Sequence, residues 1–355
     1  MGVFYWILVH VVSNGYKTKF EKVYKMKLEK VQGVKSVDMR IVSVGHGVIN
    51  WNGSPELFSG NPQKNYGKIE NHKTPKIRGM TPFSGEVTEN GFRRRLKPEE
   101  IVISDDNPMY VSGNCYRYHI FKDFVNDHHE LKLADATKLL TSVLGLLRGH
   151  VITEKRSDSV KRTSPLLVLD GIEQKHNYNF EQFGKSGSKA TSEDKKSTSI
   201  FSATTFGDTE YHTYASINIE NLQLIVLDKI FDNCAAIVTE AQGKQLAKDI
   251  AAYLKDISTD DSLDPVCTYG LYARNGSVFN HKQQAILLND DAIQVVVDWL
   301  MNRLQNLDIA QGGGYMKTSE ITVDYNDGQM FRIRESLMSA NPEKPSNGYA
   351  VYFSE

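Results

Sequence analysis

Cysteine is scarce in this sequence: the 355 residues include only Cys115, Cys234 and Cys267. The number is odd, the three lie far apart, and none belongs to a CxxC or other zinc-binding spacing. This excludes a disulfide framework and a zinc-finger type of site, and it fits a reducing compartment. We therefore expect a cytoplasmic protein, and with 40% apolar residues the chain is able to build a sizeable core.

Long apolar runs are lacking as well. Residues 3–12 are nearly all apolar, but a membrane-spanning helix needs about 20 such residues. The start also lacks the basic region and the small-residue cleavage site of a secretory signal. We expect no membrane partner. Because Met26 stands just before the first strand pattern, we interpret residues 1–30 as an extension outside the fold, with 1–25 arising from an over-long choice of start codon.

Catalytic motifs are absent too. The sequence has no GxSxG or HExxH, and no Cys–His or Ser–His pairing is recognisable from spacing. In "NDHHEL", Asp127, His128 and His129 are the best metal candidates, but neighbouring helical residues point about 100° apart and do not converge on one ion. We predict no catalytic residue, no metal and no cofactor, and hence a protein that is not an enzyme.

Strand-like and helix-like segments alternate along the chain. Apolar alternation predicts strands at 34–53, 214–232 and 320–326. A 3.6-residue periodicity predicts helices at 113–127, 133–150, 243–257 and 292–307. Two polar stretches interrupt them, at about 54–108, where hairpins are expected, and at about 153–210, which includes a low-complexity loop. The simplest account is a single α+β domain, residues 31–355, with a β-α-β-β-α-β core and two large insertions.

The net charge of −1 argues against a general binder of polyanions, but the charges are unevenly spread. Residues 73–97 contain seven basic and two acidic residues, a net charge of +5. Residues 285–327 contain two basic and seven acidic residues, a net charge of −5. This asymmetry suits a polyanion on one surface and a protein contact on another, or copies packed basic edge to acidic edge, or a solvated surface with chance clustering.

The run "IAQGGGYMKT" places three glycines between two predicted elements. Glycine motifs that bind phosphate lie between a strand and the start of a helix. Here the helix (292–307) comes first and the strand (320–326) follows. We interpret the glycines as ending that helix, either as a plain C-cap or as a loop lying against an extended polyanion, with Tyr315 beside it for stacking.

Basic residues are the better binding candidates. A loop at 155–165 combines Ser and Thr hydroxyls with four cations that suit phosphates, namely Lys155, Arg156, Lys161 and Arg162. "NCYRYHIF" places Arg117 near the start of its helix, beside tyrosines that we interpret mainly as packing. His46 lies among glycines at a strand end, where it either contacts a ligand backbone or closes a turn. "LLNDDA" is interpreted as a helix start, because acidic residues there meet the positive end of the helix dipole.

Seven stretches together resemble one family: "GHGVINWNG", "TPKIRGMT", "KRTSPLL", "FSATTFGDT", "SINIENLQLIVLDK", "ILLNDDA" and "ITVDYND". In this order they are similar to the crRNA-binding backbone subunit of a CRISPR Cascade, the Cas-seven type of the RAMP superfamily, in the type I-F variant. The similarity covers roughly residues 31–353. Residues 1–30 have no counterpart in the family, and the loop 184–197 is longer than the family pattern.

The resemblance implies an RRM-like (ferredoxin-like) palm with inserted finger and thumb elements, inside a ribonucleoprotein complex of antiviral defence. Copies of the subunit stack head to tail along the guide RNA, hold its phosphates and leave most bases exposed for pairing. The implied partners are crRNA, target DNA through the guide, other copies of the chain, and Cas-five-type and Cas-six-type subunits. DNA cleavage would come from a recruited helicase-nuclease.

The resemblance also suggests where RNA is bound, including a glycine-rich loop close to the RNA. Together with the basic residues, the expected RNA-binding set is Lys73, Lys76, Arg78, Arg117, Lys155, Arg156, Lys161, Arg162, Gly312, Gly313 and Gly314. A second group is His46, Asn50, His119 and Tyr315.

Two alternatives stay open. One is a metal-independent endoribonuclease of the same superfamily that processes guide RNA, with His46 or His119 as general acid or base. The other is a single-stranded RNA-binding protein without guide specificity.

Overall fold

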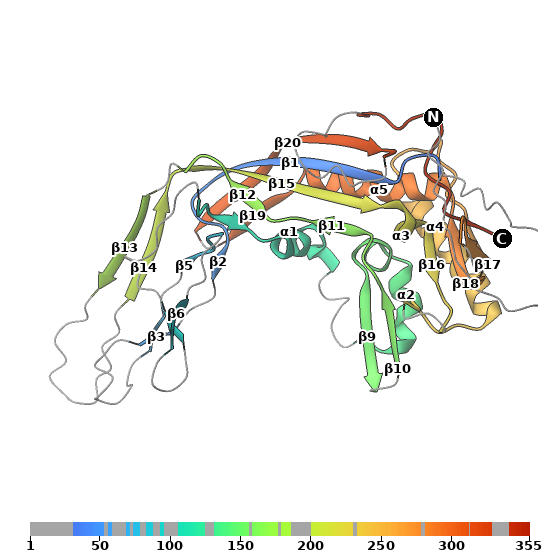
Figure 1. Cartoon of the computed structure of the whole chain (residues 1–355), viewed down its shortest axis with the longest axis horizontal. Helices are drawn as coiled ribbons and strands as arrows, with labels where there is room; N and C mark the ends of the chain where they lie inside the picture. The colour runs from blue at the N-terminus through green and yellow to red at the C-terminus, as the bar shows by residue number, and fades with distance from the viewer. Residues whose placement is uncertain are drawn as a thin grey trace, which may run out of the picture. The chain divides into compact units, whose positions relative to one another are not determined.

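The central sheet is built around the first strand predicted from the sequence. In this computed structural model, β1 (Ser36–His46) lies between β15 (Asp208–Asn218) and β20 (Gly314–Asn326) in a seven-stranded antiparallel sheet (Figure 1). Next to β20 lies β19 (Asp308–Gln311). On the far side of β15 lie β11 (Leu166–Val168), β12 (Gly171–Glu173) and β8 (Tyr110–Val111).

All described residues belong to one unit, Val31–Glu355. Within it the structure describes every residue except 53–55, 59–68, 72–73, 79–82, 88–92, 96–105, 125–130, 156–157, 177–178, 186–199, 230–232, 278–280, 312 and 329–340. The N-terminal segment 1–30, predicted to be an extension, therefore lies outside the described residues.

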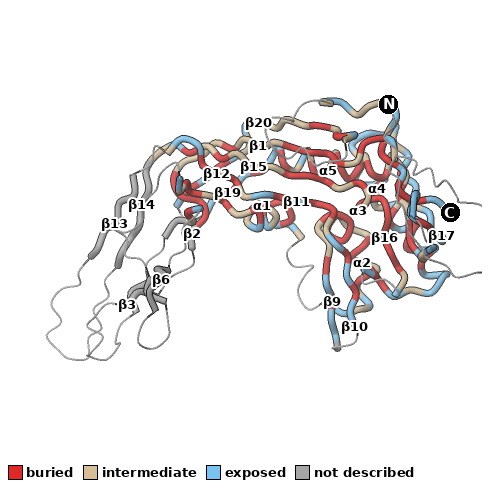
Figure 2. Tube along the Cα trace, in the orientation of Figure 1, coloured by how far each residue is buried: buried red, intermediate tan, exposed pale blue. Residues whose placement is uncertain are grey.

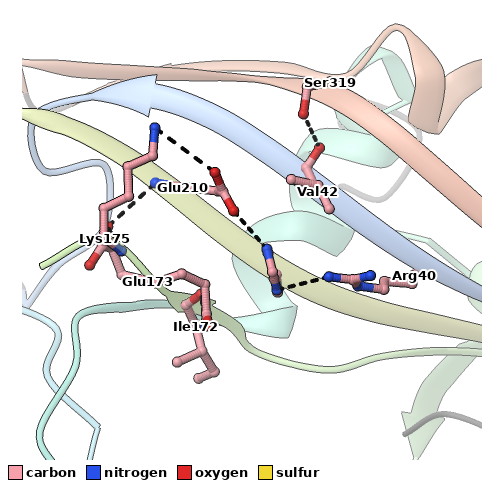
Figure 3. Close-up of polar contacts among 9 residues, drawn as sticks. Arg40, Val42, Ile172, Glu173, Lys175, Glu210 and Ser319 are labelled. Carbon is pink, nitrogen blue, oxygen red and sulfur yellow. Dashed lines mark hydrogen bonds and ion pairs between the residues drawn. The ribbon is translucent and has the colours of Figure 1, made fainter. Parts of the chain in front are cut away.

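Side chains alternate between the two faces of β1, as the pleat of a strand requires. Val37, Met39 and Ile41 are buried in the core, whereas Arg40 and Val42 on the other face are half-buried. Figure 2 shows buried residues concentrated in β1, β15 and α5. A bulge on β20 inserts Ser319 between the partners of Val42 and Ser43, and the Ser319 hydroxyl donates to the Val42 carbonyl at 3.1 Å (Figure 3).

Two helices contribute to the core beside this sheet. Tyr116 and Ile120 come from α1 (Gly113–Ile120), and Ile293 and Val297 come from α5 (Asp290–Gln305). The Asn289 side chain caps α5 by accepting from the Ala292 N–H at 2.8 Å. Asp290 and Asp291 occupy its first turn, so the predicted helix start is confirmed.

A second, four-stranded antiparallel sheet has the order β16 (Leu224–Val226), β18 (Gln283–Leu288), β17 (Cys267–Arg274) and β21 (Phe353–Ser354). The long helix α4 (Glu240–Ile257) contacts β17, and its Gly243 lies against the Tyr269 ring. A capping box at Thr239 and Gln242 begins this helix three residues before the predicted start at 243.

Paired strands occupy the two polar stretches. Between 51 and 95 these pairs are β2 (Trp51–Asn52) with β5 (Thr74–Pro75), β3 (Glu56–Phe58) with β4 (Ile69–Asn71), and β6 (Phe83–Val87) with β7 (Arg93–Arg95). In the second stretch they are β9 (His150–Lys155) with β10 (Asp158–Arg162), and β13 (Asn179–Lys185) with β14 (Ile200–Phe206).

Three predicted elements are wrong in detail. The predicted helix 113–127 is α-helical only to Ile120. The predicted helix 133–150 is broken into η3 (Leu133–Asp135), α2 (Ala136–Leu140) and a π-helical turn, η4 (Leu144–Arg148). The predicted strand 214–232 is interrupted by α3 (Ile219–Gln223), because the Asn218 side chain accepts from the Asn221 N–H at 2.8 Å and starts a helix there.

In chain order, β1, α1, β12, β15, α5 and β20 follow one another, with further elements inserted between them. The mixed α/β class with an antiparallel sheet is confirmed, and the closer RRM-like description stays a prediction. In the described part of the chain, no helix combines the length and apolarity that crossing a membrane requires.

Candidate nucleic-acid interface

The clearest binding feature is a cleft beside the start of β9. It has a volume of ≈ 500 Å³ and is lined by Arg117, Leu131 and residues 148–153. Arg117 comes from α1, and Arg148 is the last residue of the π-helical turn η4. The backbone turns sharply at Gly149, which has φ 74°. Glycine is required here, because a side chain at this position would collide with the Arg162 carbonyl. Two guanidinium groups from different elements therefore line one cleft.

Among the described residues, the Arg117 side chain is anchored by neutral acceptors alone. Its Nη1 donates to the Ser164 hydroxyl at 3.1 Å and to the Leu166 carbonyl at 2.6 Å. Its Nη2 donates to the Arg148 carbonyl at 2.9 Å. These bonds hold the guanidinium in place and leave its positive charge uncompensated.

Arg148 is half-buried and has fewer side-chain hydrogen bonds than Arg117. Among the described residues its side chain makes no hydrogen bond or ion pair. Burial lowers the pKa of Arg148, and burial together with the charge of Arg148 lowers the pKa of Arg117. Two cations that repel each other are thus held close together, with no carboxylate paired to either in the described part of the chain.

This arrangement favours an anion in the cleft. An anion would relieve the repulsion between the two positive charges. Guanidinium groups bind phosphate through two parallel donors, which makes a phosphate the best-matched ligand.

The glycine run lies in a β-hairpin and not at the end of a helix, as the flanking sequence had predicted. The helix α5 ends at Gln305, and β19 and β20 then form a hairpin whose turn contains Gly313, with φ 91°. The prediction that the glycines end a helix is therefore wrong, because the short strand β19 comes between. A Cβ at Gly314 would lie 2.6 Å from the Val48 carbonyl, so this glycine allows the hairpin to approach residues 47–50 closely.

That approach brings several predicted residues to one edge of the sheet. Gln311 donates to the Ile49 carbonyl at 2.8 Å, and the Asn50 carbonyl accepts from the Lys76 N–H at 2.9 Å. The Asn50 amide also donates to the Ser112 hydroxyl at 3.3 Å, next to the start of α1. Arg78 is exposed on the same short segment as Lys76. Asn50, Lys76, Arg78 and the glycine hairpin are therefore neighbours.

His46 and Tyr315 extend this edge with an aromatic pair. They lie opposite each other on β1 and β20, with ring centroids 6.3 Å apart in a stacked arrangement. Tyr315 is 59% exposed, and the His46 Nδ1 lies 3.1 Å from the Asp208 carboxylate. Such an exposed ring is the type of side chain on which a base stacks. The predicted neighbourhood of Tyr315 and the glycines is therefore present.

His119 differs, because it is only 9% exposed. Its ring packs edge-on against Tyr118, and neither ring nitrogen has a hydrogen-bond partner among the described residues. Burial lowers the pKa of His119, so the ring is neutral near pH 7.

The sequence suggested that Arg162 lies in a loop, and this prediction is wrong. It ends β10, is 5% exposed, and donates to the Leu146, Asn221 and Leu224 carbonyls at 3.0–3.4 Å. Burial lowers the pKa of Arg162 to about 10. These carbonyls belong to η4, to α3 and to the first residue of β16, so Arg162 ties these three elements to β10. Its neighbour Lys161 is exposed on the same strand.

The opposite face of the sheet also carries charge, but there the charges pair with each other. Arg40 donates to His212 Nδ1 at 3.3 Å, and His212 Nε2 donates to Glu210 at 2.9 Å. Lys175 lies 3.9 Å from the same carboxylate (Figure 3). Because the positive charges in this row of side chains lie beside the Glu210 carboxylate, the row attracts a phosphate less than the Arg117–Arg148 cleft does.

Some predicted residues have no described geometry. Lys73, Arg156, Gly312 and the Lys155 side chain lie outside the described residues, as do His128 and His129. Among the residues that are described, no three His, Cys, Asp or Glu side chains gather as metal ligands would.

Sequence reasoning missed Arg148. The signal was an arginine directly before a glycine, at the end of the apolar run "LLTSVLGLLRGH". Such a residue closes a helical turn at a sharp bend, where its side chain meets a neighbouring element. The interpretation of 133–150 as one continuous helix hid this bend.

Solved structures resemble the chain only distantly. One titled "CRISPR RNA-guided surveillance complex" shares 13% identity at a TM-score of 0.24, covering 67% of this chain and 69% of that one. A pre-nicking form of such a complex shares 11% identity at 0.26, with coverages of 70% and 74%. Csc2 of Thermofilum pendens shares 9% at 0.23, with 80% of both chains covered. Likenesses this weak carry no conclusion about fold or function.

No curated protein matches the chain. The family of type I-Fv CRISPR-associated proteins described as Cas7fv-like does match, over residues 33–355. That match covers most of the sequence, including β1, the residues of the Arg117–Arg148 cleft and the hairpin with the glycines. The chain therefore belongs to the Cas7fv-like family of type I-Fv CRISPR-associated proteins.

Proposed function

We propose that this protein is the crRNA-binding backbone subunit of a CRISPR surveillance complex. Family membership supports a place in such a complex. The observation that carries RNA binding is the Arg117–Arg148 cleft, where two cations share ≈ 500 Å³ with no paired carboxylate among the described residues. Its natural ligand is a phosphate of the guide.

The proposed RNA path has two parts joined by α1. Arg117 on α1 faces the Arg148 cleft, and Cys115 on the same helix accepts a hydrogen bond from Gln311 of the glycine hairpin at 3.4 Å. Lys76, Arg78 and Tyr315 belong to the hairpin side. A strand of RNA that follows α1 meets phosphate-binding cations first and an exposed aromatic ring afterwards.

In the proposed assembly, copies stack head to tail along the guide, in the cytoplasm, and leave the bases free to pair with target DNA. The palm, finger and thumb arrangement and the contacts with Cas-five-type and Cas-six-type subunits belong to the same proposal. The protein acts by binding and does not cleave RNA. Because guides vary in sequence, binding depends on phosphates and sugars.

The test compares the double variant Arg117→Gln/Arg148→Gln with a matched control, Lys248→Gln, which removes one exposed charge from α4. Affinity for a labelled single-stranded spacer RNA is measured by fluorescence anisotropy over a range of salt. We expect the double variant to lose about 1–3 kcal/mol of RNA-binding free energy, roughly 5–150-fold in affinity, and its salt slope to fall by about 1.4. The control should match the wild type.

Two results would reject the proposal. An unchanged affinity and slope in the double variant would remove the cleft from the RNA path. Discrete products from a precursor repeat RNA, in the absence of other proteins, would instead support the endoribonuclease alternative.

A further inference from the structure

A second cavity lies in an acidic part of the chain, in contrast to the cationic Arg117–Arg148 cleft. It encloses ≈ 260 Å³ and is lined by Phe124, Ile257, Asp298, Trp299 and Arg303, among others. Half of the lining residues project from α5, inside the segment 285–327 that carries a net charge of −5. The cavity is therefore small, partly aromatic and placed in an acidic part of the sequence.

Asp298 supplies an incompletely compensated negative charge. Its only hydrogen bond among the described residues comes from Gln294, one helical turn earlier, at 2.8 Å. Burial raises the pKa of Asp298, and the charge of Asp260 raises it further, against the opposing effects of Gln294 and Lys344. Among the described residues, Arg303 is the one cation that lines the cavity, and it is already paired with Asp123 at 2.6 Å.

Trp299 supplies an aromatic wall beside this carboxylate. Phe121 stacks on the indole with centroids 5.9 Å apart, and Phe124 lies tilted against it at 6.3 Å. Trp299 and Phe124 line the cavity, whereas Phe121 does not. A carboxylate next to an indole suits a guanidinium group, which pairs with the acid and stacks on the ring.

We propose that this cavity receives an arginine side chain from a second copy of the chain. The inference rests on the proposed head-to-tail assembly and names one of its contacts. A second copy is the best-matched source because the same sequence carries the complementary charge, +5 over residues 73–97. A pair of this kind, with one partner in the acidic segment and one in the basic segment, is heterologous and so extends into a row.

The chain offers a closely matched control for the acid. Gln245 and Asp249 on α4 repeat the geometry of Gln294 and Asp298, with the same spacing and the same 2.8 Å distance, but on an exposed surface. Asp298→Asn and Asp249→Asn therefore make the same chemical change to the same local motif. Only the first removes a charge from the cavity.

The main experiment measures assembly on RNA. Wild type and both variants are bound to a short RNA that holds one copy and to a long RNA that holds several, and stoichiometry and cooperativity are followed by analytical ultracentrifugation. We expect Asp298→Asn to bind the short RNA normally and to lose about fivefold or more in cooperativity on the long RNA. Asp249→Asn should match the wild type on both.

A direct probe tests the ligand chemistry. In a Trp6→Phe/Trp51→Phe background, Trp299 is the only tryptophan, and its fluorescence is titrated with N-acetyl-argininamide and with the neutral citrulline analogue. A response to arginine alone that Asp298→Asn abolishes supports the proposal. Equal responses to both compounds, or full cooperativity of Asp298→Asn on long RNA, would overturn it. Failure of the wild type to bind short RNA would instead reject the proposed function.

Discussion

Arg162 and Arg148 lie close in the chain and in the fold, yet their surroundings give them different roles. Arg162 is 5% exposed and spends its donors on three backbone carbonyls. Arg148 is half-buried beside an open cleft and has no partner for its side chain among the described residues. An arginine that satisfies buried carbonyls supports the fold, whereas one whose donors face a cavity is available to a ligand.

The largest effect expected is on stability, at Arg162. Arg162→Met should lower the free energy of unfolding by about 3–5 kcal/mol, because it leaves the Leu146 and Asn221 carbonyls buried without donors. Urea unfolding of the variant beside the wild type measures the loss. A variant with wild-type stability and weakened RNA binding would break the comparison and move Arg162 into the interface.

Arg117 should fall between the two extremes. It anchors Ser164 and Leu166 and also lines the cleft. Arg117→Gln should therefore cost about 1–2 kcal/mol of stability and a further 1 kcal/mol or so of RNA affinity. Thermal melts and anisotropy on the same preparation separate the two losses. A loss of stability alone would make Arg117 a purely structural residue, and a loss of RNA affinity alone would make it purely a binding residue.

Arg148 should affect binding alone. Arg148→Gln breaks no internal hydrogen bond of the side chain in the described part of the chain, so the melting temperature should stay within about a degree of the wild type. RNA affinity should fall roughly 5–10-fold, with a salt slope lower by about 0.7. Unfolding of this variant at normal RNA affinity would show that Arg148 has a structural partner.

The smallest effect concerns Asp298, a half-buried carboxylate whose charge is opposite to that of the cleft arginines. Burial raises the pKa of Asp298 in the folded state above the ordinary value for an aspartate. The folded protein therefore binds more protons than the unfolded chain, and stability falls as pH rises from that ordinary value through the raised pKa. The groups facing it are Gln294, Asp260 and Lys344. Asp298→Asn should therefore be as stable as the wild type or slightly more stable near pH 7, and should lose this part of the pH dependence. Urea titrations at several pH values test it, and a marked loss of stability at pH 7 would show that the charge is compensated in the fold.

Much of the candidate site was recognisable from sequence, but not the way in which its residues are grouped. Lys76, Arg78, Asn50 and Tyr315 lie in motifs whose type indicated RNA contact, and the structure brings them to one edge through contacts of the glycine hairpin. Arg162 was expected in a loop because the strand β10 is short and polar. Its burial depends on carbonyls from η4 and α3, some of them about 60 residues away in the chain.

The sequence by itself determined the elements whose signals are local. The alternation in β1, the cap and acidic first turn of α5, and the family motifs act over a few residues and are visible without a fold. Only the tertiary structure decided which cations are free. Charge compensation depends on groups brought together from distant segments, so Arg117 and Arg148 became a site, and Arg162 a support, only when η4, β10 and α3 packed around them.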